Sequence, residues 1–367
     1  MQGKNLRFLS PIDGDVLFEE LDGVLEDGML NVPLTLAAGS NATITVNGLP
    51  AVETKPGVYS VRLPIRTYRT ELCAFCHETA EKQKITVFWF KGGYRTYRIG
   101  VDDVIMSLRN IYEHREEYDS IFDDPFFAMY RELHDTYGTH THMHIYYETV
   151  DKRFNLSMFP DKYKQEFAQN AHWLRLSFHA NADLPDSPYK HASYEEVMAD
   201  GRRVEKEILR FAGAEVMDRV TSQHWADSAL PGTRAFRDLG FSLIDAYFLI
   251  DENGVPAVSY YLNAEQTRHA QTRDFWVDTT ENIIFVKDDI ILNEHTPEEV
   301  TAYLDGYISR PDRAFMYLLI HEQYFYPDYP LYLADYKERL FAGVKWCVEH
   351  GYRPSLLSDF AFGDNEF

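Results

Sequence analysis

The chain has 367 residues, of which 45% are hydrophobic and 26% are charged, and these proportions are typical of a folded globular protein. Its formal net charge of −22 argues against a nucleic-acid or anionic-membrane partner, because both need a basic surface. No segment approaches the roughly 20 uninterrupted apolar residues of a membrane span, and the first charged residues lead into no apolar stretch of the secretion-signal kind. The chain has three cysteines, too few for a disulfide framework, so the sequence predicts a cytoplasmic protein in a reducing compartment.

Residues 1–95 have the character of an all-β domain. Runs such as 42–46 and 58–63 are rich in β-branched and aromatic residues, and turn-forming pairs such as Asn47-Gly48 separate them. Several short strands at this spacing indicate a small sandwich-like accessory domain.

From residue 96 to residue 367, segments with strand character alternate with segments of helix character. Ser193 with Glu196 three residues later predicts a capped helix start, whereas the stretch 249–282 shows no clear helix. The expected strands cover 96–101, 140–147, 174–179, 216–222, 242–248, 283–287, 315–320 and 353–358, and the expected helices cover 124–137, 161–171, 194–212, 228–239, 297–309 and 332–350. Strands alternating with helices form parallel sheets, so the sequence predicts an α/β fold, a (β/α)7 TIM-like barrel behind the small all-β domain.

Polar residues stand where several of these apolar strands give way to loops. Asp102 and Asp103 follow the first strand, His179 closes the third, His224 comes shortly after the next, and His321 follows the most apolar one. The carboxyl ends of barrel strands meet at one mouth, where such folds carry their chemistry. We therefore expect these side chains to build one site.

A metal ion is the simplest explanation for this set. Asp103, His179 and His224 would supply one carboxylate and two imidazoles, and Asp183 in the loop after His179 is a further candidate ligand. Such ligands suit a divalent transition metal, zinc first, with nickel or cobalt as alternatives. Each residue alone also has a structural explanation, since Asp favours turns and helix starts and a rim His is commonly hydrogen-bonded. The joint pattern favours the metal site.

The remaining residues of these strand ends suggest acid–base chemistry and substrate contacts. In a carboxylate pair, one member can bind a cation while the other acts as a general base on water. His321 can protonate a leaving group, and Glu322 can orient it or act itself, although a charged turn explains both residues equally well. Trp225 and Tyr189 are candidate substrate contacts, because aromatic rings stack on sugars.

With Asp102-Asp103, His179 and an Ile-His-Glu sequence ending in His321-Glu322, residues 96–360 resemble the polysaccharide deacetylase (NodB-homology) superfamily. More broadly, they resemble the glycoside hydrolase/deacetylase barrels. The resemblance implies that Asp102 is the catalytic base, that Asp103 and His179 bind the metal, and that His321 is the general acid.

Two motifs of that family are absent from this sequence. Its H-x-x-x-H motif is not met, because Asp183 and Leu184 stand where the second His is expected. Its R-x-P-Y motif is also missing, and His224-Trp225 occupies that place. The third metal ligand is therefore open between His224 and Asp183.

The sequence as a whole predicts a metal-dependent hydrolase of the carbohydrate deacetylase type, which removes an acyl group from a saccharide or a related substrate. One alternative is a glycosidase that uses Asp102 and Glu322 as its carboxylate pair. Another is a barrel that binds saccharide without catalysis. Only the deacetylase hypothesis requires an ion.

Overall fold

The computed structural model describes residues 6–310 and 312–363, and these divide into two compact units. The first unit runs to Tyr94 and also includes Phe275–Asn282 and the described residues from Phe360 onward. The second unit comprises Arg95–Asp274 and Ile283–Asp359. The chain passes from the first unit to the second at residue 95, and later segments of the chain return to the first unit. Every helix in the described ranges is too short or too polar to cross a membrane.

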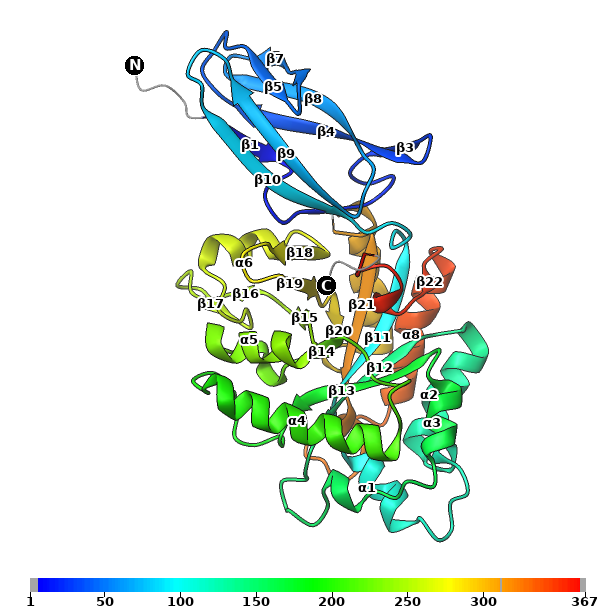
Figure 1. The fold of residues 1–367 in the computed structure, drawn as a ribbon. Helices are drawn as coiled ribbons and strands as arrows, with labels where there is room; N and C mark the ends of the chain where they lie inside the picture. Colours follow the sequence, from blue (N-terminus) through cyan, green and yellow to red (C-terminus); the bar gives the residue numbers. More distant parts are fainter. Residues whose placement is uncertain (1–5, 311, 364–367) are drawn as a thin grey trace. The chain divides into compact units, whose positions relative to one another are not determined.

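Up to Tyr94, the described residues of the first unit form strands and no helix. The strands are β1 (Arg7–Ser10), β2 (Val16–Leu17), β3 (Val24–Glu26), β4 (Met29–Ala37), β5 (Ile44–Val46), β6 (Leu49–Pro50), β7 (Val52–Lys55), β8 (Val58–Ile65), β9 (Arg69–Cys76) and β10 (Lys82–Trp89). One sheet has the order β1-β4-β8-β7 with β3 beside β4, and the other has the order β2-β10-β9-β5-β6 (Figure 1). Both sheets contribute to one buried apolar cluster, with Leu34 and Tyr59 from the first and Leu72 and Val87 from the second. A further strand, β18 (Phe275–Asp278), also belongs to this unit.

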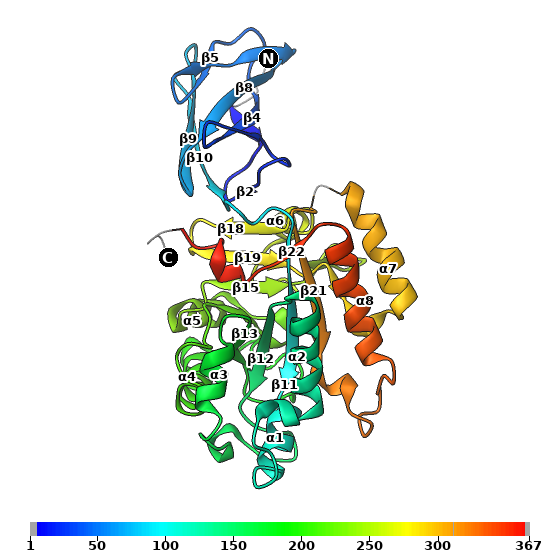
Figure 2. The same ribbon diagram turned by 90° about the vertical axis from the view of Figure 1, so that its right-hand side faces the viewer.

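The second unit is a mixed α/β structure, in which helices lie outside a set of central strands. Its strands are β11 (Thr96–Val104), β12 (Thr141–Tyr146), β13 (Leu174–Ala180), β14 (Val220–Ser222), β15 (Leu243–Ala246), β16 (Leu249–Ile250), β17 (Pro256–Ala257), β19 (Ile283–Lys287), β20 (Ile290–Ile291), β21 (Phe315–His321) and β22 (Arg353–Pro354). Its helices are α1 (Met106–Glu113), α2 (Pro125–Tyr137), α3 (Lys164–Asn170), α4 (Tyr194–Phe211), α5 (Leu230–Leu239), α6 (Ala264–Ala270), α7 (Pro297–Asp305) and α8 (Tyr336–Glu349). Figure 2 shows α4 and α5 on one side of the central strands and α7 and α8 on the other.

Local sequence signals explain where several helices begin and end. Ser193 caps α4 with Glu196 in a reciprocal capping box, as the sequence predicts. Gly138 ends α2 in the left-handed conformation with φ 70°, which glycine adopts without steric cost. Two helices were missed. Helix α1 directly follows β11, and α6 lies inside the stretch 249–282, where it is too short to show a clear apolar period.

The central strands are parallel but do not close into one hydrogen-bonded barrel, so the expectation of a closed barrel is wrong for the described residues. One sheet has the order β13-β12-β11-β21-β20, and β14, β15 and β19 pair in that order in another. Between β13 and β14 a single bridge joins Leu176 to Met217. At this seam, the gap between the two sheets, a side chain also bonds to the backbone: the Thr221 hydroxyl donates to the carbonyl of Phe178. At the other seam, the Asp289 carboxylate accepts the backbone N–H of Tyr317.

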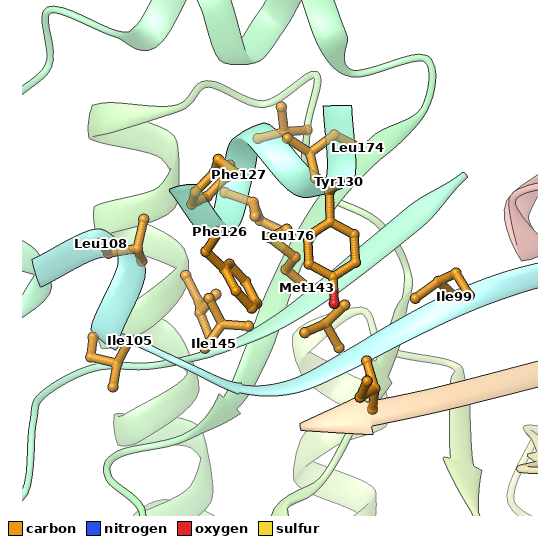
Figure 3. Packing of buried hydrophobic residues seen from close by; sticks show 14 of the residues in the cluster. Ile99, Ile105, Leu108, Phe126, Phe127, Tyr130, Met143, Ile145, Leu174 and Leu176 are labelled. Carbon is orange, nitrogen blue, oxygen red and sulfur yellow. The ribbon is translucent and has the colours of Figure 1, made fainter. Parts of the chain in front are cut away.

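An apolar core between the strands and helices fixes these elements in place. Helix α2 buries Phe126, Phe127 and Tyr130 on one face, at the spacing of a helix that packs against a sheet. Figure 3 shows these rings beside strand residues such as Ile99 and Met143. Because the strands are held on their outer side by this core, their carboxyl ends form a firm frame for polar side chains.

Candidate metal centre

Strand β11 does not stop before its two carboxylates but continues through Asp102 and Asp103 to Val104. The backbone takes a left-handed conformation at Asp103, with φ 66°, and the pairing with β12 gains one extra residue between Val101 and Val104. Adjacent side chains in a regular strand point to opposite faces, whereas a bulge re-aims them. Both carboxylates, each 5% exposed, therefore line the same cavity.

A trio of side chains, those of Asp103, His179 and His224, converges near the carboxyl ends of three central strands. Oδ1 of Asp103 lies 3.1 Å from Nε2 of His179 and 3.3 Å from Nδ1 of His224, and these two nitrogens are 3.2 Å apart. His179 belongs to β13, and His224 starts a short helical turn after β14. All three side chains are buried, and their ligand atoms are close enough together to hold one metal ion.

The far nitrogen of each imidazole is hydrogen-bonded to a backbone carbonyl. Nδ1 of His179 lies 2.6 Å from the oxygen of Ser222, and Nε2 of His224 lies 3.0 Å from that of Asp183. A neutral imidazole that donates from one nitrogen presents a lone pair at the other. With the proton on the far nitrogen of each ring, two nitrogen lone pairs face the Asp103 carboxylate oxygen, an arrangement that a cation among the three atoms would stabilise.

The pKa shifts of His179 and Asp103 agree with a positive charge at this position. Burial by itself lowers the pKa of His179, but the carboxylates of Asp102 and Asp103 raise it to about 9. Burial raises the pKa of Asp103, yet hydrogen bonds with His179 and His224 hold it well below its usual range. In the metal-free protein a proton on His179 supplies this positive charge, and a bound metal would displace that proton.

Asp102 occupies a separate position beside the trio. Its Oδ1 accepts a hydrogen bond from Nδ1 of His144 at 2.5 Å, and its Oδ2 accepts one from the Ser222 hydroxyl at 2.7 Å. Burial opposes its ionisation, but His179 and His144 lower its pKa below the usual range. His144 is not among the residues that the sequence singled out, so its contact with Asp102 was missed. Asp102 is thus an ionised, oriented carboxylate at the edge of the cavity.

Tyr146 and Gln323 also contact Asp103, and the sequence did not single out either one. The Tyr146 hydroxyl donates to Asp103 Oδ1 and lies 3.0 Å from Nδ1 of His224. The Gln323 amide nitrogen donates to Asp103 Oδ2 at 2.6 Å. The only signal in the sequence was position: Tyr146 follows His144 by two residues on one strand face, and Gln323 follows His321 by two.

His321 lies on β21 in register with Asp102 of the neighbouring β11. Its Nδ1 is 2.9 Å from the side-chain oxygen of Asn293, so it donates there, and its Nε2 is left for the cavity that it lines with Asp102. Asn293 also accepts the backbone N–H of His321 at 3.2 Å. One amide oxygen therefore fixes both the backbone and the ring of His321.

Glu322, predicted to orient an acid or to act itself, lines neither of the cavities at Asp103. It is fully buried and turned to the start of α1, where its carboxylate accepts the backbone N–H groups of Ile105 and Met106, each at 2.6 Å, and that of Ser107 at 2.9 Å. The Ser107 hydroxyl donates as well, at 2.5 Å. Helix starts leave such N–H groups without partners, and a carboxylate satisfies them. Glu322 anchors α1 and is not free for chemistry.

The remaining predicted residues divide between core and cavity. Tyr189 is buried, its hydroxyl donates to Asp200 at 3.2 Å, and its ring packs near Phe178; it lines a separate cavity and not the one at Asp102. Trp225 is 51% exposed and lines the cavity. The Asp183 carboxylate lies 3.8 Å from Nε2 of His224, outside the converging trio.

Two cavities meet at Asp103. The larger has a volume of about 710 Å³ and is lined by Asp102, His224, Trp225 and His321 among others. The smaller, of about 280 Å³, lies beside Tyr146. Asp103 lines both cavities, and His224 lines the larger one.

No family model and no curated protein matches the chain. Among solved structures, the chain is similar to a CE4 esterase from Streptococcus mutans, with 10% identity, 72% of this chain and 87% of that chain covered, and a TM-score of 0.38. It is also similar to a candidate polysaccharide deacetylase from Mycobacterium smegmatis, with 9% identity, 71% and 85% covered, and a TM-score of 0.37. A third, a candidate polysaccharide deacetylase of O-antigen biosynthesis from Bordetella bronchiseptica, has 11% identity, 71% and 87% covered, and a TM-score of 0.31. At TM-scores this low the likeness carries no conclusion about chemistry, which has to come from the residues of the site.

Proposed function

We propose that the protein is a metal-dependent hydrolase that removes an acyl group from a carbohydrate or a related substrate. The second unit would be a (β/α)7-type scaffold for this reaction, and the first an accessory sandwich-like module. The observation that carries the proposal is the convergence of Asp103, His179 and His224, whose ligand atoms lie within 3.3 Å of one another while backbone carbonyls are hydrogen-bonded to the far nitrogens of both rings.

The three residues fit a zinc ion, or a nickel or cobalt ion of similar size. Zinc bonds its nitrogen and oxygen ligands at about 2.0–2.2 Å, and a tetrahedral arrangement then separates two ligand atoms by about 3.3–3.5 Å. The observed separations of 3.1, 3.2 and 3.3 Å are near that value. Carbonyl acceptors behind ligating imidazoles are the usual second layer of such sites. A zinc ion bound there would supply Lewis-acid activation of water and of the acyl carbonyl.

The residues around the trio would divide the proton transfers between them. Asp102 would take the proton of the attacking water, because it is ionised and its two oxygens are held by His144 and Ser222. His321 would deliver a proton from Nε2 to the departing amine or alkoxide, since Asn293 holds its Nδ1. The exposed ring of Trp225 would contact the sugar.

The glycosidase alternative needs Glu322 as its second carboxylate, and Glu322 does not line the cavity. Asp102 lines the cavity, but both oxygens of Glu322 are occupied by the start of α1. A pair of carboxylates facing one glycosidic bond is what that chemistry requires. No specific observation favours the alternative of a non-catalytic saccharide-binding barrel.

The test is acetate release from N-acetylated chito-oligosaccharides, measured before and after the metal is removed with a chelator. Activity that disappears with the chelator and returns with zinc would support the proposal. Release of reducing sugar without acetate would favour a glycosidase instead.

A further inference from the structure

The wall of the large cavity away from the trio carries carboxylates that the proposed reaction does not use. Asp245 lies on β15, and Asp288 follows β19. They are 1% and 5% exposed, and both line the cavity. One oxygen of each, Oδ1, is buried without a hydrogen-bond partner among the described residues.

Charge is poorly balanced on this wall. Asp245 faces Arg98 at 3.7 Å and accepts the Tyr317 hydroxyl through its Oδ2, which compensates only one of the two residues. No ion pair to Asp288 is found within the described ranges, and no described Lys or Arg lines the cavity. Burial raises the pKa of both carboxyl groups, that of Asp288 well above its usual range, so the neutral form is favoured in the free protein and a ligand cation would favour the ionised form.

A neutral residue on the same wall points independently to a ligand. Gln223, which follows β14 and is 1% exposed, lines the cavity, yet neither its side-chain nitrogen nor its oxygen has a hydrogen-bond partner among the described residues. Nearly all buried polar side-chain atoms in folded proteins are hydrogen-bonded. Gln223 follows Ser222, which pairs with Asp245 across β14 and β15, and its amide and the two carboxylates line one cavity that suits a polar, positively charged group.

We propose that Asp245, Asp288 and Gln223 form a subsite for an ammonium group, so that the preferred substrate is an acylated amine that carries a second, free amino group. A partly acetylated oligomer of amino sugars has this chemistry. The substrate class rests on the proposed function, but the ammonium subsite does not.

An ammonium group fits this wall better than a second metal ion. Metal sites need several ligand atoms close together, and the described groups that meet this condition all contain Asp102 or Asp103 with histidines. Asp245 and Asp288 belong to neither group. An ammonium ion has three rotatable donors and tolerates looser geometry, and Trp225, Tyr247 and Tyr324 in the same cavity offer rings to a cation.

The test compares binding of the disaccharide of glucosamine with binding of cellobiose, which has hydroxyl groups in place of the two amines. Calorimetric titration at about pH 6, where amines are protonated, should show the diamine binding at least about tenfold more tightly to the wild-type protein. Asp288→Asn should remove about tenfold or more of that preference, because it keeps the shape and removes the charge. The matched control Glu294→Gln changes an exposed carboxylate of the same cavity and should alter the preference by less than about twofold.

Equal affinity for the two disaccharides, no binding of either, or a preference that survives Asp288→Asn would overturn the ammonium subsite. Metal analysis covers the remaining possibility: a second equivalent of divalent ion that Asp288→Asn removes would show that the wall binds metal instead. Thermal unfolding of Asp288→Asn checks that the variant is folded. Because binding is read without turnover, a failure to release acetate would overturn the proposed function and leave this result standing.

Discussion

Two neighbouring parallel strands, β11 and β21, each have a pair of adjacent polar residues near their carboxyl end, and the two pairs are oriented differently. At the end of β11 a bulge with a left-handed residue turns both Asp102 and Asp103 into the cavity. At the end of β21 the regular alternation holds, so His321 faces the cavity while Glu322 faces the start of α1. Two adjacent polar residues at a strand end therefore share a site only where the backbone is irregular.

The largest expected effect is on turnover, from Asp102→Asn. The variant keeps the size of the side chain, but it replaces one acceptor oxygen with an amide donor and loses the base, so turnover in acetate release should fall by about 10²–10⁴-fold with the metal still bound. Near-wild-type turnover would remove Asp102 from the mechanism even if a metal were present.

His321→Ala should lower turnover within the same range of about 10²–10⁴-fold, because a positioned acid is lost. The wild-type rate should follow a bell-shaped pH profile, and the variant should lack the alkaline limb that reports the acid. The free energy of unfolding should change little, since His321 is only partly buried. An unchanged pH profile would contradict the assignment of His321.

Glu322→Ala, at the residue directly after His321, should show the opposite behaviour. Three backbone N–H groups of α1 lose their acceptor, so the free energy of unfolding should fall by about 3 kcal/mol in urea denaturation. Turnover per folded molecule should remain far above that of His321→Ala. Full stability combined with lost turnover would mean that the two residues share one catalytic role after all.

The pKa of His179 gives a prediction for the metal-free protein. Its pKa is raised from 6.5 to about 9, so its stabilising effect is complete below pH 6.5 and is lost as the pH rises through about 9. The free energy of unfolding should fall by on the order of 3 kcal/mol across this window. His179→Gln should flatten the dependence, and zinc should abolish it by replacing the proton. A metal-free protein of constant stability from pH 6 to about 10 would contradict the charge assigned to His179.

Much of this arrangement could be predicted from the sequence, because it depends on local patterns. The alternation of strands and helices, the capping box at Ser193 and the convergence of Asp103, His179 and His224 all follow from positions along the chain. Other features depend on contacts between distant residues. The Glu322 carboxylate meets a helix start more than 200 residues earlier in the sequence, and nothing near it in the chain indicates that partner.

The same limit explains three further differences. Tyr189 is an aromatic residue in a polar loop, and only the packed rings around it show that it belongs to the core. Tyr146 and Gln323 contact Asp103 through the fold alone. The open seams of the central strands arise where side chains such as Thr221 and Asp289 take backbone partners, which no strand pattern reveals.

Metal content is the most direct measurement of the central claim. Elemental analysis of the purified protein should find about one divalent transition ion per chain, and Asp103→Asn and His179→Ala should each lose most of it. Asp183→Asn is the matched control and should retain the ion, because its carboxylate lies outside the trio. Ion content unchanged in both Asp103→Asn and His179→Ala would contradict the account.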